Sequence, residues 1–123
     1  MAIIALTGCS GTLSAPQRIQ HIASIAAQQG WQRHVVNGEQ FDLLAFLPPQ
    51  NSSQPLLTIY IEGDGHAWQS RFEASDNPTP VKPIALELAL QHPGAVYLSR
   101  PCQSIKSPLC TPVLWTNGRF SEP

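Results

Sequence analysis

Apolar residues recur with two different spacings along the chain, and the spacing predicts which segments are helices and which are strands. Between Ser14 and Gly30 they recur three or four residues apart, the period of one helix face. Ser14 before this segment, Pro16 early in it and Gly30 after it are residue types that commonly begin and end helices. The pattern therefore predicts a helix between Ser14 and Gly30.

Two further apolar runs, 31–36 and 41–47, are separated by the dipeptide Asn37-Gly38. Asn-Gly is typical of tight hairpin turns, because both turn positions take a positive φ. We therefore expect an antiparallel hairpin. Residues 56–61 follow a loop rich in proline and serine, and this continuous, β-branched-rich run is the strongest strand pattern in the chain.

The second half of the chain predicts one more helix and one more strand. The apolar residues of segment 83–92 alternate as in a strand, but its Ala, Leu, Glu and Gln favour a helix. A proline at its start and Pro93-Gly94 after its end agree with the helix. The short apolar run 95–99 predicts the next strand. A strand, a helix and a strand of these lengths predict a parallel pair with a right-handed crossover, and so an α/β fold.

The composition narrows the class of protein further. Charged residues make up 12% of the 123 residues, about half the usual globular share, and this indicates buried strands with neighbours on both faces. The net charge is -1 and the seven Lys and Arg residues are scattered, so we expect no nucleic-acid partner. No apolar run approaches the ~20 residues needed to cross a bilayer.

Cys9 resembles the modified cysteine of a bacterial lipobox, since it follows Leu-Thr-Gly near the N-terminus. In such proteins a signal peptidase cuts before the cysteine, whose sulfur carries a diacylglyceryl group. Residues 1–8 are then a truncated signal remnant and 9–30 a tether with the N-terminal helix. Because residues 1–8 lack a basic region and are short, either the true start lies upstream or the match is chance. The first alternative predicts a lipid-anchored protein of the cell envelope, facing the periplasm.

Cys102 and Cys110 enclose a short loop that contains Pro108. In an exported protein a disulfide between them would persist, and closing this loop would stabilise the fold by about 2–3 kcal/mol. The alternative is a pair of unpaired buried thiols, as in a cytosolic protein. Together with a lipidated Cys9, the disulfide accounts for all three cysteines.

The segment 60–68, Tyr-Ile-Glu-Gly-Asp-Gly-His-Ala-Trp, resembles the third strand of an α/β-hydrolase running into its oxyanion loop, with Glu62 where many members have His. Segment 99–103 resembles the end of the fourth strand, and 115–120 the approach to the next helix. The combination is similar to a group of bacterial hydrolase-like lipoproteins. This resemblance implies that residues 31–123 are the front part of an α/β-hydrolase domain, an antiparallel hairpin leading into a parallel β-α-β unit, and that the domain is incomplete.

The resemblance also implies where the site lies. The backbone amides of an oxyanion loop stabilise a developing negative charge, and two glycines let the backbone turn sharply beside a ligand. The residues implicated in this loop are Gly63, Asp64, Gly65 and His66. Trp68 is a candidate for the wall of an acyl pocket, and the alternative is that it is simply a core residue. For the loop, the alternative is a tight turn after a buried strand.

The catalytic residues themselves are missing from the sequence. The nucleophile elbow of the family reads Gly-x-Ser-x-Gly and precedes the acid and the His, but no such motif occurs up to Pro123. The resemblance therefore implies that the chain contributes the oxyanion loop of a serine hydrolase for an ester, amide or thioester, and that it is inactive alone. The alternative is a non-catalytic envelope lipoprotein that binds or scaffolds.

Two other interpretations concern charged residues. Glu62, Asp64 and His66 alternate and in an extended segment could bind a metal, but the intervening glycines disfavour extension and no other ligand cluster is present. We expect no metal and no other cofactor. Arg71 and Arg100 could orient a carboxylate or phosphate of a substrate, and the alternative is that they are solvated or ion-paired.

Overall fold

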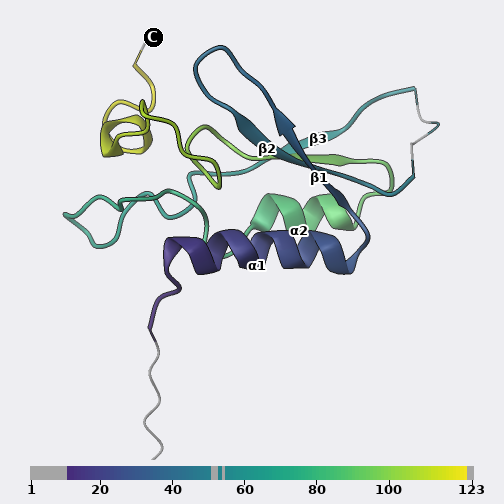
Figure 1. Cartoon of the computed structure of the whole chain (residues 1–123), viewed down its shortest axis with the longest axis horizontal. Coiled ribbons are helices and arrows are strands. Elements are labelled where there is room, and N and C mark those ends of the chain that lie inside the picture. The colour runs from purple at the N-terminus through teal and green to yellow at the C-terminus, as the bar shows by residue number, and fades with distance from the viewer. Residues whose placement is uncertain (1–10, 51–52, 54, 122–123) are drawn as a thin grey trace, which may run out of the picture.

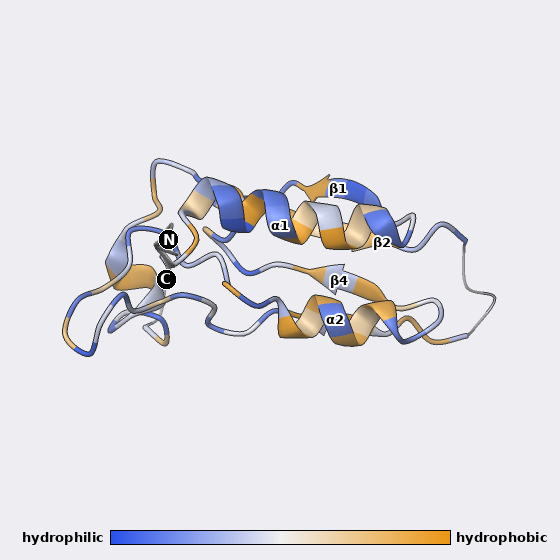
Figure 2. Ribbon diagram, turned by 90° about the horizontal axis from the view of Figure 1, so that it is seen from below, coloured by the Kyte–Doolittle hydropathy of each residue, from blue (hydrophilic) through white to orange (hydrophobic). Residues whose placement is uncertain are grey.

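The computed structural model describes residues 11–50, 53 and 55–121, and these form a mixed α/β fold. Two helices lie side by side on one face of a four-stranded sheet (Figures 1 and 2). The elements in chain order are α1 (Ala15–Gln28), β1 (Gln32–Val36), β2 (Leu43–Leu47), β3 (Ile59–Ile61), α2 (Ile84–Leu90), β4 (Val96–Leu98) and the 3₁₀ helix η1 (Pro112–Trp115). Neither α-helix of the described chain has the length and apolar character needed to cross a membrane.

The strands lie in the order β1-β2-β4-β3. β1 and β2 pair antiparallel, β2 pairs antiparallel with β4, and β3 pairs parallel with β4. Since α2 lies between β3 and β4 in the chain, these three elements form a parallel β-α-β unit. The predicted hairpin and the predicted parallel pair are both confirmed.

Helix α1 begins and ends where the sequence predicts. The backbone N–H of Ser14 donates to the side-chain oxygen of Gln17 at 2.8 Å, which satisfies a donor at the helix start. Ile22 and Ala26 are fully buried on one helix face. Gly30 then takes a φ of +73°, the left-handed conformation that commonly follows a helix.

The core lies between the two helices and the sheet. The aromatic rings of Phe46 and Tyr97 stack at 5.8 Å between their centroids, and they anchor the sheet side. Burial of each large side chain contributes about 1.5–3 kcal/mol, so this cluster holds the helices against the sheet. Its fully buried members are Ile22, Ala26, Leu44, Phe46, Leu86, Ala89 and Tyr97.

Arg18 is a charged residue of α1 that lies almost completely buried. Its guanidinium donates to three carbonyl oxygens, those of Leu13 at 2.6 Å, Thr79 at 2.8 Å and Asn77 at 3.0 Å. The last two belong to the long segment between β3 and α2. Because a buried charge must be hydrogen-bonded to be tolerated, Arg18 fixes this irregular segment against the helix.

The turn of the hairpin differs from the prediction. Residues 37–42 connect β1 and β2, and Gly38 does not take a positive φ. The prediction of a two-residue turn at Asn37-Gly38 is therefore wrong. Gly38 is instead required because a Cβ there would lie 2.2 Å from the carbonyl oxygen of Phe41. The side chain of Asn37 donates to Asp42 at 3.2 Å and closes the wider loop.

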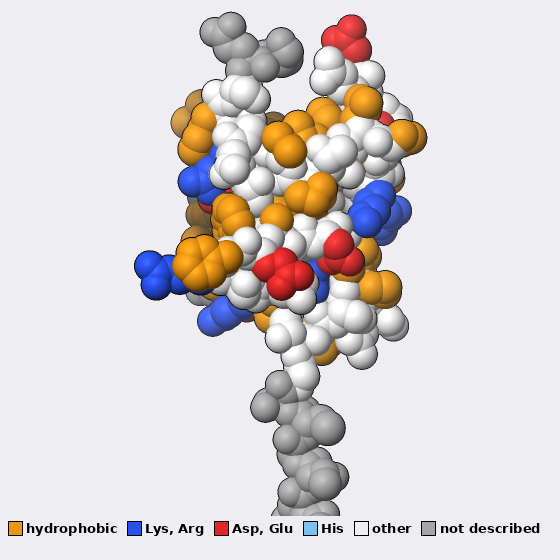
Figure 3. Space-filling view, turned by 90° about the vertical axis from the view of Figure 1, so that its left-hand side faces the viewer, with side chains coloured by type: hydrophobic (Ala, Val, Ile, Leu, Met, Phe, Trp, Pro, Cys, Tyr) orange, Lys and Arg blue, Asp and Glu red, His pale blue; other side chains and the backbone are white. Residues whose placement is uncertain are grey.

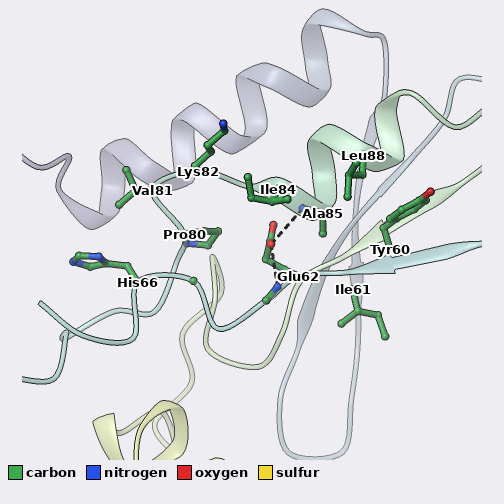
Figure 4. Close-up of a pocket in the computed structure, with 12 residues that line it drawn as sticks. Tyr60, Ile61, Glu62, His66, Pro80, Val81, Lys82, Ile84, Ala85 and Leu88 are labelled. Atoms are coloured by element: carbon green, nitrogen blue, oxygen red, sulfur yellow. Dashed lines mark hydrogen bonds between the residues drawn. The ribbon is translucent and has the colours of Figure 1, made fainter. Parts of the chain in front are cut away.

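The strand predicted at 56–61 is shorter and less buried than expected. β3 covers only Ile59–Ile61, and Leu56 and Leu57 before it are 81% and 67% exposed. β3 pairs on one side only, with β4, and the described helices cover one face of the sheet. Ile61 points away from α2 (Figure 4), and both Ile59 and Ile61 are exposed. The expectation of a strand with neighbours on both faces is therefore wrong for β3.

The predicted disulfide is confirmed. Cys102 and Cys110 are bonded, with 5.6 Å between their Cα atoms. Cys102 is buried and packs with Ala67 and Trp115 in a second, smaller core. The proposed lipidation site, Cys9, and the segment 1–8 lie outside the described residues.

Candidate functional site

The segment 62–66 follows β3 directly and lies at the carboxyl end of the parallel pair. The segment 99–104 follows β4 and reaches the same end of the sheet, so two of the segments on which the hydrolase resemblance was based lie together. The side chain of Gln103 donates to the carbonyl oxygen of Gly63 at 2.8 Å and joins them directly. Ligands of parallel α/β sheets bind at this end of the strands. Figure 3 shows this end of the molecule, where hydrophobic side chains reach the surface among a few charged ones.

Gly65 is essential to the shape of the loop. Its φ is +65°, and a Cβ at this position would lie 2.1 Å from the carbonyl oxygen of Pro78. The same carbonyl accepts the backbone N–H of His66 at 3.0 Å. The loop is therefore pressed against the segment before α2, at a distance that only glycine permits.

The backbone amides of this loop divide into two groups. The amide of His66 donates to Pro78, and that of Gly63 donates to Oε1 of Glu62 at 3.0 Å. The amides of Asp64 and Gly65 form no hydrogen bond with any residue that the structure describes. Of the four residues that the sequence implicated, these two retain an N–H for a ligand.

Glu62 stands where the resembling family commonly has His, and it anchors the loop to α2. Its carboxylate is buried, and Oε1 also accepts the backbone N–H of Ala85 at 3.4 Å, at the start of the helix (Figure 4). Oε2 and the hydroxyl of Tyr97 are buried without a hydrogen-bond partner among the described residues. Burial raises the pKa of Tyr97, and the nearby charge of Glu62 raises it further. The Tyr97 phenol therefore stays neutral at any physiological pH.

The sequence predicts no role for Gln103, but the structure gives it a central one. It is 2% exposed. Besides the hydrogen bond to Gly63, its side-chain oxygen accepts the backbone N–H of Arg100 at 3.1 Å. Glutamine in a loop is usually exposed, so the sequence held no signal for this bridge.

The backbone around Gln103 is strained. Cys102 and Ser104 take φ values of +67° and +63°, which cost about 1–3 kcal/mol each for residues other than glycine. The disulfide holds the backbone at Cys102 in place. A hydrogen bond of 2.8 Å from the N–H of Ser104 to Oγ1 of Thr79 holds the backbone at Ser104. Strain of this kind persists only where the surroundings determine the backbone.

A hollow of about 680 Å³ lies on one side of the loop, between β3 and α2 (Figure 4). Residues of the loop 62–66 line one side of this hollow, and Glu62 points toward the start of α2 (Figure 4). The walls are mainly apolar, and the edge of β3 that bears no partner strand borders the hollow. The lining residues are Tyr60, Ile61, Glu62, Gly63, Gly65, His66, Pro80, Val81, Lys82, Ile84, Ala85 and Leu88.

A second cavity, of about 280 Å³, lies on the other side of the loop. Asp64 lines it together with Arg100 and Arg119, and both arginines donate to the Asp64 carboxylate. Phe41 and Trp115 contribute apolar walls. The interpretation of Arg100 as an ion-paired residue agrees with this arrangement.

Trp68 and Arg71 lie apart from these two cavities. Trp68 is 43% exposed and lines neither of them. Trp115 is a core residue, whose indole N–H donates to the carbonyl oxygen of Ser75 at 3.0 Å. Arg71 is exposed and lies 5.4 Å from the ring centroid of Phe72. Among the described residues, no group of three or more His, Cys, Asp or Glu side chains is placed to hold a metal ion.

No protein-family model, curated protein or solved structure matches the chain.

Proposed function

We propose that the chain is the N-terminal part of a serine hydrolase for an ester, amide or thioester, and that it contributes the oxyanion loop. The supporting observation is the pair of unengaged amides at Asp64 and Gly65, in a glycine-containing loop fixed at the carboxyl end of a parallel strand pair. In α/β-hydrolases one oxyanion donor comes from the loop after the third strand, and the second comes from the nucleophile elbow. The nucleophile, acid and His of this enzyme lie outside residues 1–123.

The sheet supports the same proposal. An antiparallel hairpin leading into a parallel β-α-β unit is the expected front of the α/β-hydrolase sheet, and the free edge of β3 borders the 680 Å³ hollow. A further parallel strand on that edge would end beside Asp64 and Gly65. A nucleophile elbow at the end of this strand would bring its serine next to both amides.

The residues of this chain would then act by holding a preorganised loop. Pro78 and Gln103 fix the backbone on either side of the two amides, so little reorganisation accompanies the reaction. Removal of a single oxyanion donor typically lowers the rate by about 10²–10³. Because the chain has no Gly-x-Ser-x-Gly motif, residues 1–123 alone are expected to hydrolyse no activated ester.

Anchoring through a lipid on Cys9, in the cell envelope, belongs to the same proposal. The disulfide between Cys102 and Cys110 supports an exported protein, since such bonds persist in oxidising compartments. The proposed partners are a small ester or amide substrate and, through the lipid, a membrane.

The test begins with sequencing the source DNA on both sides of the reading frame. We expect the frame to continue past Pro123 into Gly-x-Ser-x-Gly and then an Asp or Glu and a His. The full product should react with a fluorophosphonate that labels activated serines. Gln103→Ala should slow labelling about tenfold or more because the loop loses an anchor, whereas Arg71→Gln, on the exposed surface, should not.

A stop codon directly after Pro123 would overturn the catalytic proposal. The alternative, a non-catalytic envelope lipoprotein that binds or scaffolds, would then replace it. Labelling of the full product that is equally fast in the Gln103→Ala variant would instead refute the role given to the loop.

A further inference from the structure

The second cavity is lined by more positively charged than negatively charged side chains. Both oxygens of the Asp64 carboxylate accept a hydrogen bond, one from Arg100 and the other from Arg119. The three side chains come from the loop after β3, the loop after β4 and the turn after η1. Two guanidinium groups and one carboxylate leave one positive charge at the cavity.

Both arginines retain donors that Asp64 does not use. A guanidinium carries five N–H donors in a planar fork. Hydrogen bonds to described residues engage one terminal nitrogen, Nη1, on each side chain. The Arg100 and Arg119 side chains are only 35% and 33% exposed, so an anion held by them would be partly shielded from water.

The rest of the cavity is largely apolar. Phe41, Leu114 and Trp115 line it, and the hydrogen bond to Ser75 holds the indole of Trp115 in place. A volume of about 280 Å³ is at the small end of the range for ligand sites. The cavity therefore combines a cationic end with hydrophobic walls, in a space suited to a small molecule.

We propose that this cavity binds a small monocarboxylate with an apolar body. One surplus positive charge balances one negative charge, whereas a dianion would leave the site negative. A planar guanidinium also matches a carboxylate through two parallel hydrogen bonds. The site needs no nucleophile, so the proposal is independent of the hydrolase proposal.

The test is a titration of the ¹⁵N-labelled chain, residues 1–123, with hexanoate at low salt. The indole N–H of Trp115 and the Nε–H groups of Arg100 and Arg119 report on the cavity walls and on its cationic end. We expect the chemical shifts of these groups to change saturably with hexanoate. Hexanamide, which lacks the charge, and inorganic phosphate should each bind at least about tenfold more weakly. Absence of saturable shifts, or equal affinity for hexanamide, would overturn the proposal. Tighter binding of phosphate would overturn the ligand class.

Variants of three residues separate binding from a merely structural ion cluster. Arg119→Gln should weaken hexanoate binding about tenfold, and Arg71→Gln, which is exposed and outside the cavity, should leave it unchanged. Asp64→Asn should tighten binding about threefold or more, because it removes the competing carboxylate. A cluster that only ties three segments together predicts no gain in affinity from Asp64→Asn. If Arg119→Gln fails to fold, Arg119→Lys keeps the charge without the planar fork and is expected to bind hexanoate more weakly.

Discussion

Replacing Gly65 with alanine tests whether the loop after β3 is held as the structure has it. A left-handed backbone costs a residue with a Cβ about 1–2 kcal/mol relative to glycine. The new Cβ would also lie 2.1 Å from the oxygen of Pro78 and 2.8 Å from Nε2 of Gln103, so both neighbours must move. That movement weakens the hydrogen bonds from His66 to Pro78 and from Gln103 to Gly63, each worth about 0.5–1.5 kcal/mol. The expected loss of unfolding free energy is therefore about 2–5 kcal/mol.

Gly63 provides a matched control two residues away in the same loop. Its φ is not positive, and a Cβ there would meet nothing within 4 Å. Gly63→Ala should change the unfolding free energy by less than about 1 kcal/mol, because alanine also restricts the unfolded chain. Urea unfolding followed by tryptophan fluorescence, with linear extrapolation, measures both variants. Equal midpoints for Gly65→Ala and Gly63→Ala would refute the close contact with Pro78.

Three further predictions concern the disulfide, Arg18 and His66. Cys110→Ser removes the disulfide to Cys102 and should lower the unfolding free energy, measured in urea, by about 2–3 kcal/mol. Adding a reductant to the unmodified protein should have the same effect. Arg18→Met should lower the unfolding free energy by about 2–4 kcal/mol in the same assay, because three carbonyls lose a charged donor. Arg33→Met, on the exposed strand β1, should lower it by about 0.5 kcal/mol or less. Burial, and then the charge of Arg18, lowers the pKa of His66, so the unfolded chain takes up a proton more readily as the pH falls below about 6.5. Stability should therefore decrease between pH 7 and pH 5, and less so in His66→Gln; equal pH profiles of the two proteins would contradict this.

The elements that local patterns determine were predictable. The period of apolar residues and the capping serine placed α1, and the sequence of strand, helix and strand predicted the parallel pair around α2. The edge position of β3 was not predictable, because it depends on which strands meet across the sheet. The turn at Gly38 was also missed, since the glycine is needed for the approach of Phe41 and not for a positive φ.

The candidate site was predictable only in part. The resemblance pointed to the loop 62–66 as a candidate, but the engagement of the His66 amide depends on Pro78, more than ten residues later in the chain. The partners of Asp64 lie 36 and 55 residues away, at Arg100 and Arg119. Contacts of this separation leave no spacing signal in a single sequence. The same holds for Gln103, whose burial follows from the packing of three loops.

The disulfide makes the shape of both cavities depend on the compartment in which the chain folds. Cys102 lies directly before Gln103, whose hydrogen bond to Gly63 fixes the loop between the two cavities. Arg100, which lines the second cavity, lies two residues before Cys102. In a reducing cytosol the left-handed backbone at Cys102 loses the bond that fixes it. The hollow beside β3 and the cavity with the two arginines then lose a common support. Protein produced in a reducing host and protein produced in an oxidising one should therefore differ at both cavities together, while the core of α1, α2 and the sheet, which contains neither cysteine, remains the same.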